Sequence, residues 1–189
     1  MQSTLLTPTT LDLFTFGELQ DHIRFIEAED KADADRKVKA AIAWCEEYTC
    51  RSFLTCTRRV KLRCFPAWGE PIRLDRPPWQ SITSITYLDA LGDEQALAAS
   101  VYGVSEDKGH VWLKNSQSWP TTLSQEDAVT ITYVSGWESA ADVPEDIKQA
   151  VLFLFGHNFA NREAVTSAPT SEVQLTVESY LAPWVAPRY

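Results

Sequence analysis

The stretch from Val129 to Ala150, VTITYVSGWESAADVPEDIKQA, contains the two patterns that decide the fold. Its first half has a period of two, with Val129, Ile131 and Tyr133 on one face, which indicates a half-buried strand. Its second half, at Val143-Pro144-Glu145-Asp146, places a proline in the first turn of a helix and two carboxylates near the positive end of the helix dipole. A strand therefore precedes a helix here.

Upstream of this junction, the sequence has the signs of a β module. From Cys56 the period is again two, because Val60, Leu62 and Cys64 alternate with basic residues at 59, 61 and 63. Turn-forming residues separate the later apolar runs, as is typical of antiparallel sheets. The further strand candidates are 71–74, 81–88, 102–104, 111–113 and 128–134. The β module is predicted to span 56–136.

Two helices are predicted before the module. Thr15 and Glu18 have the spacing of a capping box, so a short helix should follow Thr15. Asp33 or Asp35 is expected to cap a longer helix that ends near Cys50. That helix has one apolar face and a charged remainder.

The helix that starts near 143 is apolar on more than one face. One stripe contains Ile147 and Val151, and another contains Phe155 and Phe159. Either the chain's own core covers both stripes or a neighbouring subunit covers one of them. For the second case, the candidate interface residues are Phe153, Phe155, Gly156 and Phe159.

The last segment, 164–189, is predicted to be an extended tail. Its opening is small and polar, and Val173, Leu175 and Val177 then alternate as in an edge strand, with Tyr180 and Trp184 as aromatic anchors. The tail is expected to dock on a partner. The alternative is that it folds back onto the chain's own β module.

Composition and charge exclude several classes of protein. The chain is 44% hydrophobic and 23% charged, and no 18-residue apolar run predicts a membrane span. The N-terminus has no basic residue before its apolar ones, so we expect no secretory signal. We expect synthesis in the cytoplasm. The net charge of −9 comes from residues 1–50 and 136–189, while 51–135 is balanced. High-affinity binding to duplex DNA is therefore not expected.

No pattern of catalytic or metal-binding residues emerges from the sequence. The four cysteines lack a C-x-x-C pair and a nearby histidine, so we expect free thiols in a reducing compartment. Phosphate-binding, nucleophile-elbow and zinc-protease motifs are missing, and the three histidines have no motif partner. We therefore expect no cofactor, no metal and no enzymatic activity. Several of the seven tryptophans lie beside turns, which keeps a carbohydrate-binding or receptor-binding β module open as an alternative.

Five stretches, taken in order, resemble the head-tail connector (adaptor) family of long-tailed phages and gene transfer agents. The run 42–53 is similar to the family's helix ending in Glu-x-Tyr-Thr-Gly-Arg, with Cys50 in place of the usual glycine. The other four stretches are 72–82 with its Pro-Pro pair, the Tyr-x-Asp-x-x-Gly hairpin at 87–92, the strand end at 129–137, and the Val-Pro helix at 143–150 with its terminal Asn-Arg-Glu at 161–163.

The resemblance implies an α+β fold, in which a discontinuous α-helical bundle domain carries an inserted antiparallel β module and an extended C-terminal tail. The expected segments are 1–14, an N-terminal segment; 15–55 with 137–163, the helical connector core; 56–136, the β module; and 164–189, the tail. The change from a helical period to a two-residue period and back predicts that residues 15–52 pack against 143–163. The resemblance covers about residues 15–163.

For function, the resemblance implies a non-enzymatic virion protein of the neck. The subunit would form a homo-oligomeric, usually dodecameric ring, with the portal protein above and a tail or stopper protein below. DNA would pass through the lumen without specific binding, and no membrane is involved. From the tail's own pattern rather than from the resemblance, Val173, Leu175, Val177, Tyr180 and Trp184 are expected to dock on the portal or on an adjacent subunit. The alternative from another class is a nucleic-acid-binding DNA-packaging factor, whose basic recognition helix the sequence lacks.

Overall fold

The computed structural model describes residues 2–23, 28–105, 109–161 and 170–187, and its fold is mixed α+β. The chain forms two compact units. The helical unit consists of Leu11–Leu54 and Trp137–Pro187. The β unit consists mainly of Thr55–Gly136 with the N-terminal residues up to Thr10.

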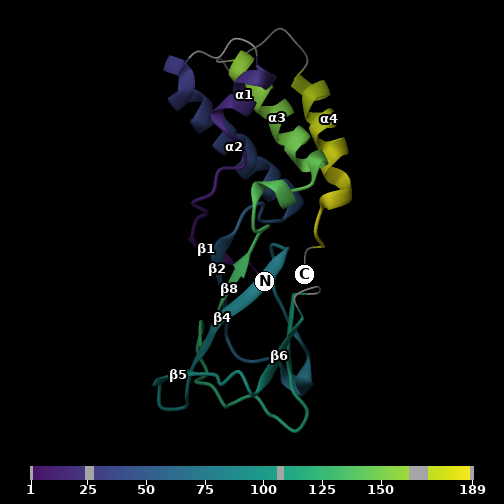
Figure 1. The fold of residues 1–189 in the computed structure, drawn as a ribbon. Helices are drawn as coiled ribbons and strands as arrows, with labels where there is room; N and C mark the ends of the chain where they lie inside the picture. Colours follow the sequence, from purple (N-terminus) through teal and green to yellow (C-terminus); the bar gives the residue numbers. More distant parts are fainter. Residues whose placement is uncertain (1, 24–27, 106–108, 162–169, 188–189) are drawn as a thin grey trace. The chain divides into compact units, whose positions relative to one another are not determined.

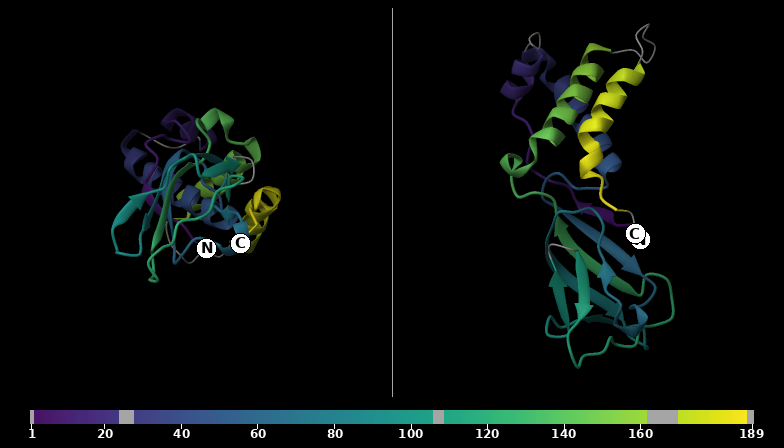
Figure 2. Two further views of the ribbon diagram at one scale, coloured as in Figure 1. Left: turned by 90° about the horizontal axis from the view of Figure 1, so that it is seen from below. Right: turned by 90° about the vertical axis from the view of Figure 1, so that its right-hand side faces the viewer.

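The helical unit contains four α-helices. They are α1 (Phe16–His22), α2 (Lys31–Thr49), α3 (Glu145–Ala160) and α4 (Thr170–Leu181), and short 3-10 turns η1 (Ala28–Asp30), η3 (Ala140–Asp142) and η4 (Ala182–Trp184) flank them (Figure 1). α3 packs against both α2 and α4, and α3 and α4 run antiparallel, side by side, in both views (Figures 1 and 2).

The predicted capping box begins α1. Thr15 Oγ1 accepts a hydrogen bond from the Glu18 amide at 3.3 Å, and Glu18 Oε2 accepts one from the Thr15 amide at 2.7 Å. Two otherwise unpaired amides are thereby satisfied, and the prediction is confirmed. The predicted start of α2 was wrong. The helix begins at Lys31, with Asp30 at the N-cap position and Asp33 already in the first turn.

One apolar core holds the four helices together. The core residues with no measurable exposure include Phe53, Ile147, Val151, Phe155, Val177 and Leu181. Every α-helix contributes to the core, since Leu19 comes from α1 and Ala41 and Cys45 come from α2. Burying each large apolar side chain stabilises the unit by about 1.5–3 kcal/mol.

The prediction of an extended C-terminal tail was wrong. Thr170–Leu181 is the helix α4, and Val177 and Leu181 are fully buried in the helical core. The alternation of Val173, Leu175 and Val177 suggested a strand. Val173, Val177 and Leu181 also follow one another at four-residue steps, which is the spacing of a helical stripe. The segment forms a helix because this stripe packs against the apolar surface of α3.

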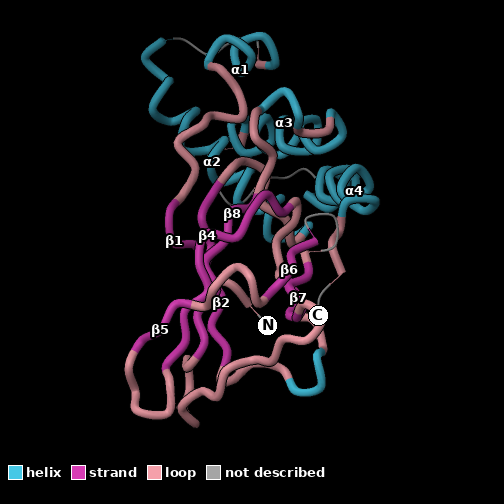
Figure 3. Tube along the Cα trace, turned by 60° about the horizontal axis from the view of Figure 1, so that its bottom comes forward, coloured by secondary structure: helices cyan, strands magenta, loops and turns pink. Residues whose placement is uncertain are grey.

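The β unit contains two antiparallel sheets (Figure 3). The five-stranded sheet has the order β1-β2-β8-β4-β5, and the three-stranded sheet has the order β3-β7-β6. The strands are β1 (Thr4–Thr7), β2 (Cys56–Leu62), β3 (Ile72–Arg73), β4 (Trp79–Leu88), β5 (Glu94–Ala96), β6 (Tyr102–Ser105), β7 (His110–Leu113) and β8 (Val129–Ser135).

The two-residue period seen in the sequence becomes an inner and an outer face of the larger sheet. In β8, Val129, Ile131 and Tyr133 are buried, and the residues between them are half-buried. Val60 pairs with Ile131 across β2 and β8, and Ile85 pairs with Ile131 across β4 and β8. These inner residues form the separate core of the β unit.

Strand β1 was not predicted. It pairs antiparallel with β2, with Thr4 opposite Arg59, although all four of its residues are exposed. Polar contacts of the preceding residue hold it in place. The Ser3 amide donates to Asp75 Oδ2 at 2.8 Å, and Arg58 Nε donates to Ser3 Oγ at 2.7 Å.

Within the described ranges, the helices are too short or too polar to span a membrane.

Candidate functional site

The described residues form no group of three or more histidine, cysteine or acidic side chains that could hold a metal ion. Two of the four free cysteines, Cys45 and Cys56, are buried, while Cys64 is exposed. Burial raises the pKa of the Cys45 thiol to about 12, which keeps it protonated and unreactive as a nucleophile. The candidate site residues named from the sequence lie on α3 and at the C-terminal end, and their environments are described below.

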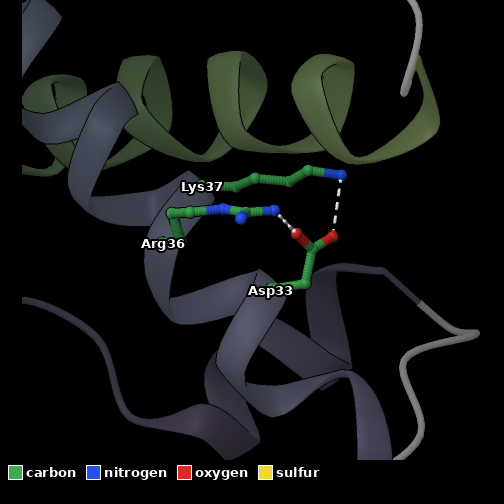
Figure 4. A network of polar contacts seen from close by, with 3 residues as sticks. All are labelled: Asp33, Arg36 and Lys37. Carbon is green, nitrogen blue, oxygen red and sulfur yellow. Dashed lines mark hydrogen bonds and ion pairs between the residues drawn. The ribbon is translucent and has the colours of Figure 1, made fainter.

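A charged cluster joins the start of α2 to the end of α3. In Figure 4 the Asp33 carboxylate lies between Arg36 and Lys37, and the Lys37 ammonium is 3.0 Å from Asp33 Oδ2. The same ammonium lies 4.9 Å from the centroid of the Phe159 ring, a cation-π contact. Lys37, followed by Arg36, lowers the pKa of Asp33. Through Lys37 the cluster links the first turns of α2 to the last turn of α3.

The candidate interface residues on α3 have different environments. Phe155 is fully buried in the helical core and is not available at the surface of a single subunit. Phe159 is half-buried, because it packs against Phe155 and beneath Lys37. Gly156 lies near α1, where an added Cβ would be 3.5 Å from His22 Nε2. Phe153 is the exposed member, at 37%, and its ring packs against Tyr180 of α4.

The candidate docking residues at the C-terminal end lie on and after α4. Val177 is fully buried, and Val173, Tyr180 and Trp184 are half-buried against the helical core. Leu175 projects from the opposite side of the stripe and is 64% exposed. The apolar excess of α3 is thus partly covered by the chain's own α4, an arrangement the sequence had left open.

The segment after α4 is anchored to the end of α2. Arg51 Nε donates to the Trp184 carbonyl oxygen at 2.5 Å, and its guanidinium lies 6.0 Å from the Trp184 ring centroid. The Ala186 amide donates to the Thr49 carbonyl oxygen at 2.8 Å. Cys50 turns the chain toward Arg51 with a left-handed φ of 53°. The Trp184 Nε1 atom is buried without a hydrogen-bond partner in the part of the chain that the structure describes.

Sequence reasoning missed several exposed apolar side chains. In the helical unit, Trp44 stacks on Tyr48 with ring centroids 5.4 Å apart, yet it remains partly exposed. In the β unit, the exposed apolar residues are Leu5 and Leu6 of β1, Leu91 in the β4–β5 turn, Val104 of β6 and Trp112 of β7. No sequence period marks single exposed residues of this kind, because they lie on edges and turns.

The charge of the chain is divided unequally between the units. The two segments of the helical unit contain 17 acidic and 8 basic residues, whereas the rest of the chain contains 9 of each. The helical unit therefore carries the whole net charge of −9. A surface of this sign repels nucleic-acid phosphates.

Comparisons with known proteins show that the fold of this chain is similar to that of solved structures. No protein-family model matches the chain, and no curated protein matches it. A chain from the virion of a native gene transfer agent (GTA) particle superposes with a TM-score of 0.79 at 23% identity, covering 100% of this chain and 97% of that one. A chain from the neck of a native GTA particle computed with C12 symmetry has a TM-score of 0.76 at 21% identity, with the same coverage.

A third chain, from the neck of an empty GTA particle computed with C6 symmetry, has a TM-score of 0.78 at 21% identity, again over 100% of this chain and 97% of that one. At these identities the likeness establishes the fold, which extends over both units of the chain.

Proposed function

We propose that this chain is a structural subunit of the neck of a tailed phage or gene transfer agent, a head-tail connector (adaptor) that forms a ring beneath the portal. The observation that carries the proposal is the likeness of fold, over the full length of the chain, to chains from the virion and neck of GTA particles. The finer assignment to a head-tail connector rests on the sequence resemblance in five ordered stretches. Assembly, rather than catalysis, is the proposed activity.

The helical unit is proposed as the ring-forming part. Phe153 and Trp44 leave apolar area exposed on helices that are otherwise well packed, and such area favours contacts between proteins. Phe153, Gly156 and Phe159 are retained as interface candidates, while the buried Phe155 supports them from within. A head-to-tail contact between identical subunits forms a ring when its rotation closes, and the C12 symmetry of one similar neck supports twelve copies, while another similar neck was computed with C6 symmetry.

The C-terminal end is proposed as the attachment point for the portal or an adjacent subunit. Leu175 and Val185 are exposed apolar residues there, and the buried Trp184 Nε1 still lacks an acceptor among the described residues. A buried donor without a partner costs about 1–3 kcal/mol, so an acceptor supplied on assembly would strengthen attachment. Tyr180 and Trp184 would be held ready by Phe153 and Arg51.

DNA is proposed to pass through the ring without being bound. The excess of negative charge on the helical unit disfavours stable contact with phosphates and favours free passage. The portal protein would lie above the ring and a tail or stopper protein below it, in the neck of the virion.

The test is assembly. Purified chain, alone and mixed with the portal protein of the same particle, is imaged by negative stain, and a strain that lacks the gene is examined for particles. Rings that sit on the portal, together with an accumulation of tailless heads in the deleted strain, are expected. Normal tailed particles in the deleted strain would refute the proposal. Low-salt filter binding with duplex DNA separates it from the DNA-packaging alternative, which requires tight, salt-dependent retention.

A further inference from the structure

Leu91 lies in the turn that joins β4 to β5, two strands labelled in Figure 1. Leu91 is 89% exposed, the highest value among the exposed large apolar residues of the described chain. A lone exposed leucine is ordinary on a flexible loop. This turn is built differently, because its backbone is held by a dense set of hydrogen bonds.

Asp89 organises the turn. Its Oδ1 accepts hydrogen bonds from the Leu91 amide at 2.9 Å and the Asp93 amide at 3.1 Å, and its Oδ2 accepts one from Gln95 Nε2 at 3.0 Å. The backbone closes the same turn, with the Gly92 amide donating to the Asp89 carbonyl oxygen at 3.0 Å and the Asp89 amide donating to the Asp93 carbonyl oxygen at 2.9 Å.

Gly92 adopts a φ of +91°, which side chains disfavour, so the glycine permits this geometry. The hydrogen bonds from the Asp93 and Leu91 amides also lower the pKa of the Asp89 carboxyl group. The conformation that exposes Leu91 is therefore preformed, and little ordering entropy is lost when Leu91 becomes buried by a partner.

The surroundings of Leu91 are acidic. Asp93 and Glu94 are exposed beside it, and the sequence contains no lysine or arginine from Pro77 to Asp107. An anionic membrane surface would repel this tip, and so would the helical unit of another copy, which carries the net charge of −9. The rest of another copy, with 9 acidic and 9 basic residues, has no net positive charge to attract it. A surface complementary to this tip would have an apolar pocket with basic groups around it.

We propose that the β4–β5 turn inserts Leu91 into an apolar pocket rimmed by lysine or arginine on a different protein of the particle. The inference rests on the proposed neck function and specifies one contact by which the ring joins its next layer. Leu91 supplies buried apolar area, and Asp93 and Glu94 pair with the basic rim. Asp89 acts as a positioning residue, since its carboxylate holds the turn rather than meeting the partner.

The experiment uses full-length chain in a strain that lacks the gene, complemented with wild type, Leu91→Ser, Leu91→Met or the neighbouring control Ala90→Ser. Purified particles are scored by electron microscopy for rings on heads and for attached tails. In vitro, purified rings are mixed separately with portal-bearing heads and with tails from the deleted strain. Because Leu91 is exposed in the subunit, all variants should melt at the wild-type temperature.

Leu91→Ser is expected to form rings but to be retained about tenfold to a hundredfold more weakly by either the heads or the tails. Leu91→Met and Ala90→Ser should behave as wild type, and raising the salt concentration should weaken wild-type retention. Normal retention of Leu91→Ser would overturn the inference. A Met variant as defective as the Ser variant would also overturn it, by showing that turn shape matters rather than apolar burial.

Loss of ring formation in Leu91→Ser would overturn the choice of partner, because it would place the pocket on a second copy of this chain. If wild-type chain neither joins heads nor restores tails, the proposed function itself fails. That result is distinguishable, since it appears without any change at Leu91.

Discussion

Replacing Leu181 by alanine tests whether α4 belongs to the folded core of the subunit. Leu181 has no measurable exposure and lies at the end of α4, in the core formed with α2 and α3. Truncating such a leucine removes buried methyl groups and leaves a cavity, which costs about 2–5 kcal/mol. The matched control is Leu175→Ala on the same helix, where the side chain is 64% exposed.

Leucine and alanine have similar helix propensities, so the pair separates burial from helix formation. Leu175→Ala should change the free energy of unfolding by less than about 0.5 kcal/mol. The assay is urea unfolding followed by far-ultraviolet circular dichroism at a helical wavelength, because the four α-helices described all lie in the helical unit. Equal midpoints for the two variants would refute the packing of α4 and restore the idea of a detached tail.

Four further predictions follow from individual residues. Cys50→Gly should raise the unfolding free energy by up to about 1 kcal/mol, since glycine adopts the left-handed conformation at φ 53° without a Cβ clash; a lower urea midpoint would contradict this. Tyr133→Phe removes the 2.5 Å hydrogen bond to Asp75 Oδ1 and should cost about 1–3 kcal/mol, seen as faster hydrogen exchange in β2 and β8; unchanged exchange would show that the bond is dispensable. Phe153→Asp should abolish rings in negative stain while the melting temperature stays close to wild type, whereas intact rings would remove Phe153 from the interface. Burial raises the pKa of Cys45 from 9.0 to about 12, so the thiol ionises at lower pH in the unfolded chain than in the folded chain, and the free energy of unfolding should fall as pH rises above 9. The measurement compares the urea midpoints of wild type and Cys45→Ala at pH 8 and pH 10.5. The midpoint of Cys45→Ala should fall less between these two pH values than that of wild type.

Elements with strong local signals were predictable. The Thr15–Glu18 capping box, the Pro144 start of α3 and the alternation in β2 and β8 each depend on residues adjacent in sequence, and the structure contains all of them. Strand β1 was missed because its four residues are exposed and show no alternation. Polar contacts with Asp75 and Arg58, distant in the chain, hold the residue before it.

The candidate site was less predictable than the fold. The sequence indicated that α3 has more apolar surface than one stripe, but it left open whether a neighbour or the chain itself covers the excess. The structure buries Phe155 and leaves Phe153 partly exposed beside Tyr180. Which of two phenylalanines faces solvent depends on where α4 packs, and no local pattern on α3 contains that information.

The sequence by itself determined the division into helical and β segments, the acidic balance of the flanking regions and the lack of catalytic motifs, because periodicity, charge and motif spacing are local properties. Only the tertiary structure decided that residues 170–181 form a helix instead of a strand, since Val173 and Val177, four residues apart, fit both periods. Packing against the apolar surface of α3 stabilises the helix by burying Val177 and Leu181, and it leaves Leu175 exposed. Where a segment fits both a helical and a strand period, the apolar surface of a distant segment determines which of the two forms. The free energy gained by burying apolar area exceeds the difference in local helix and strand propensity.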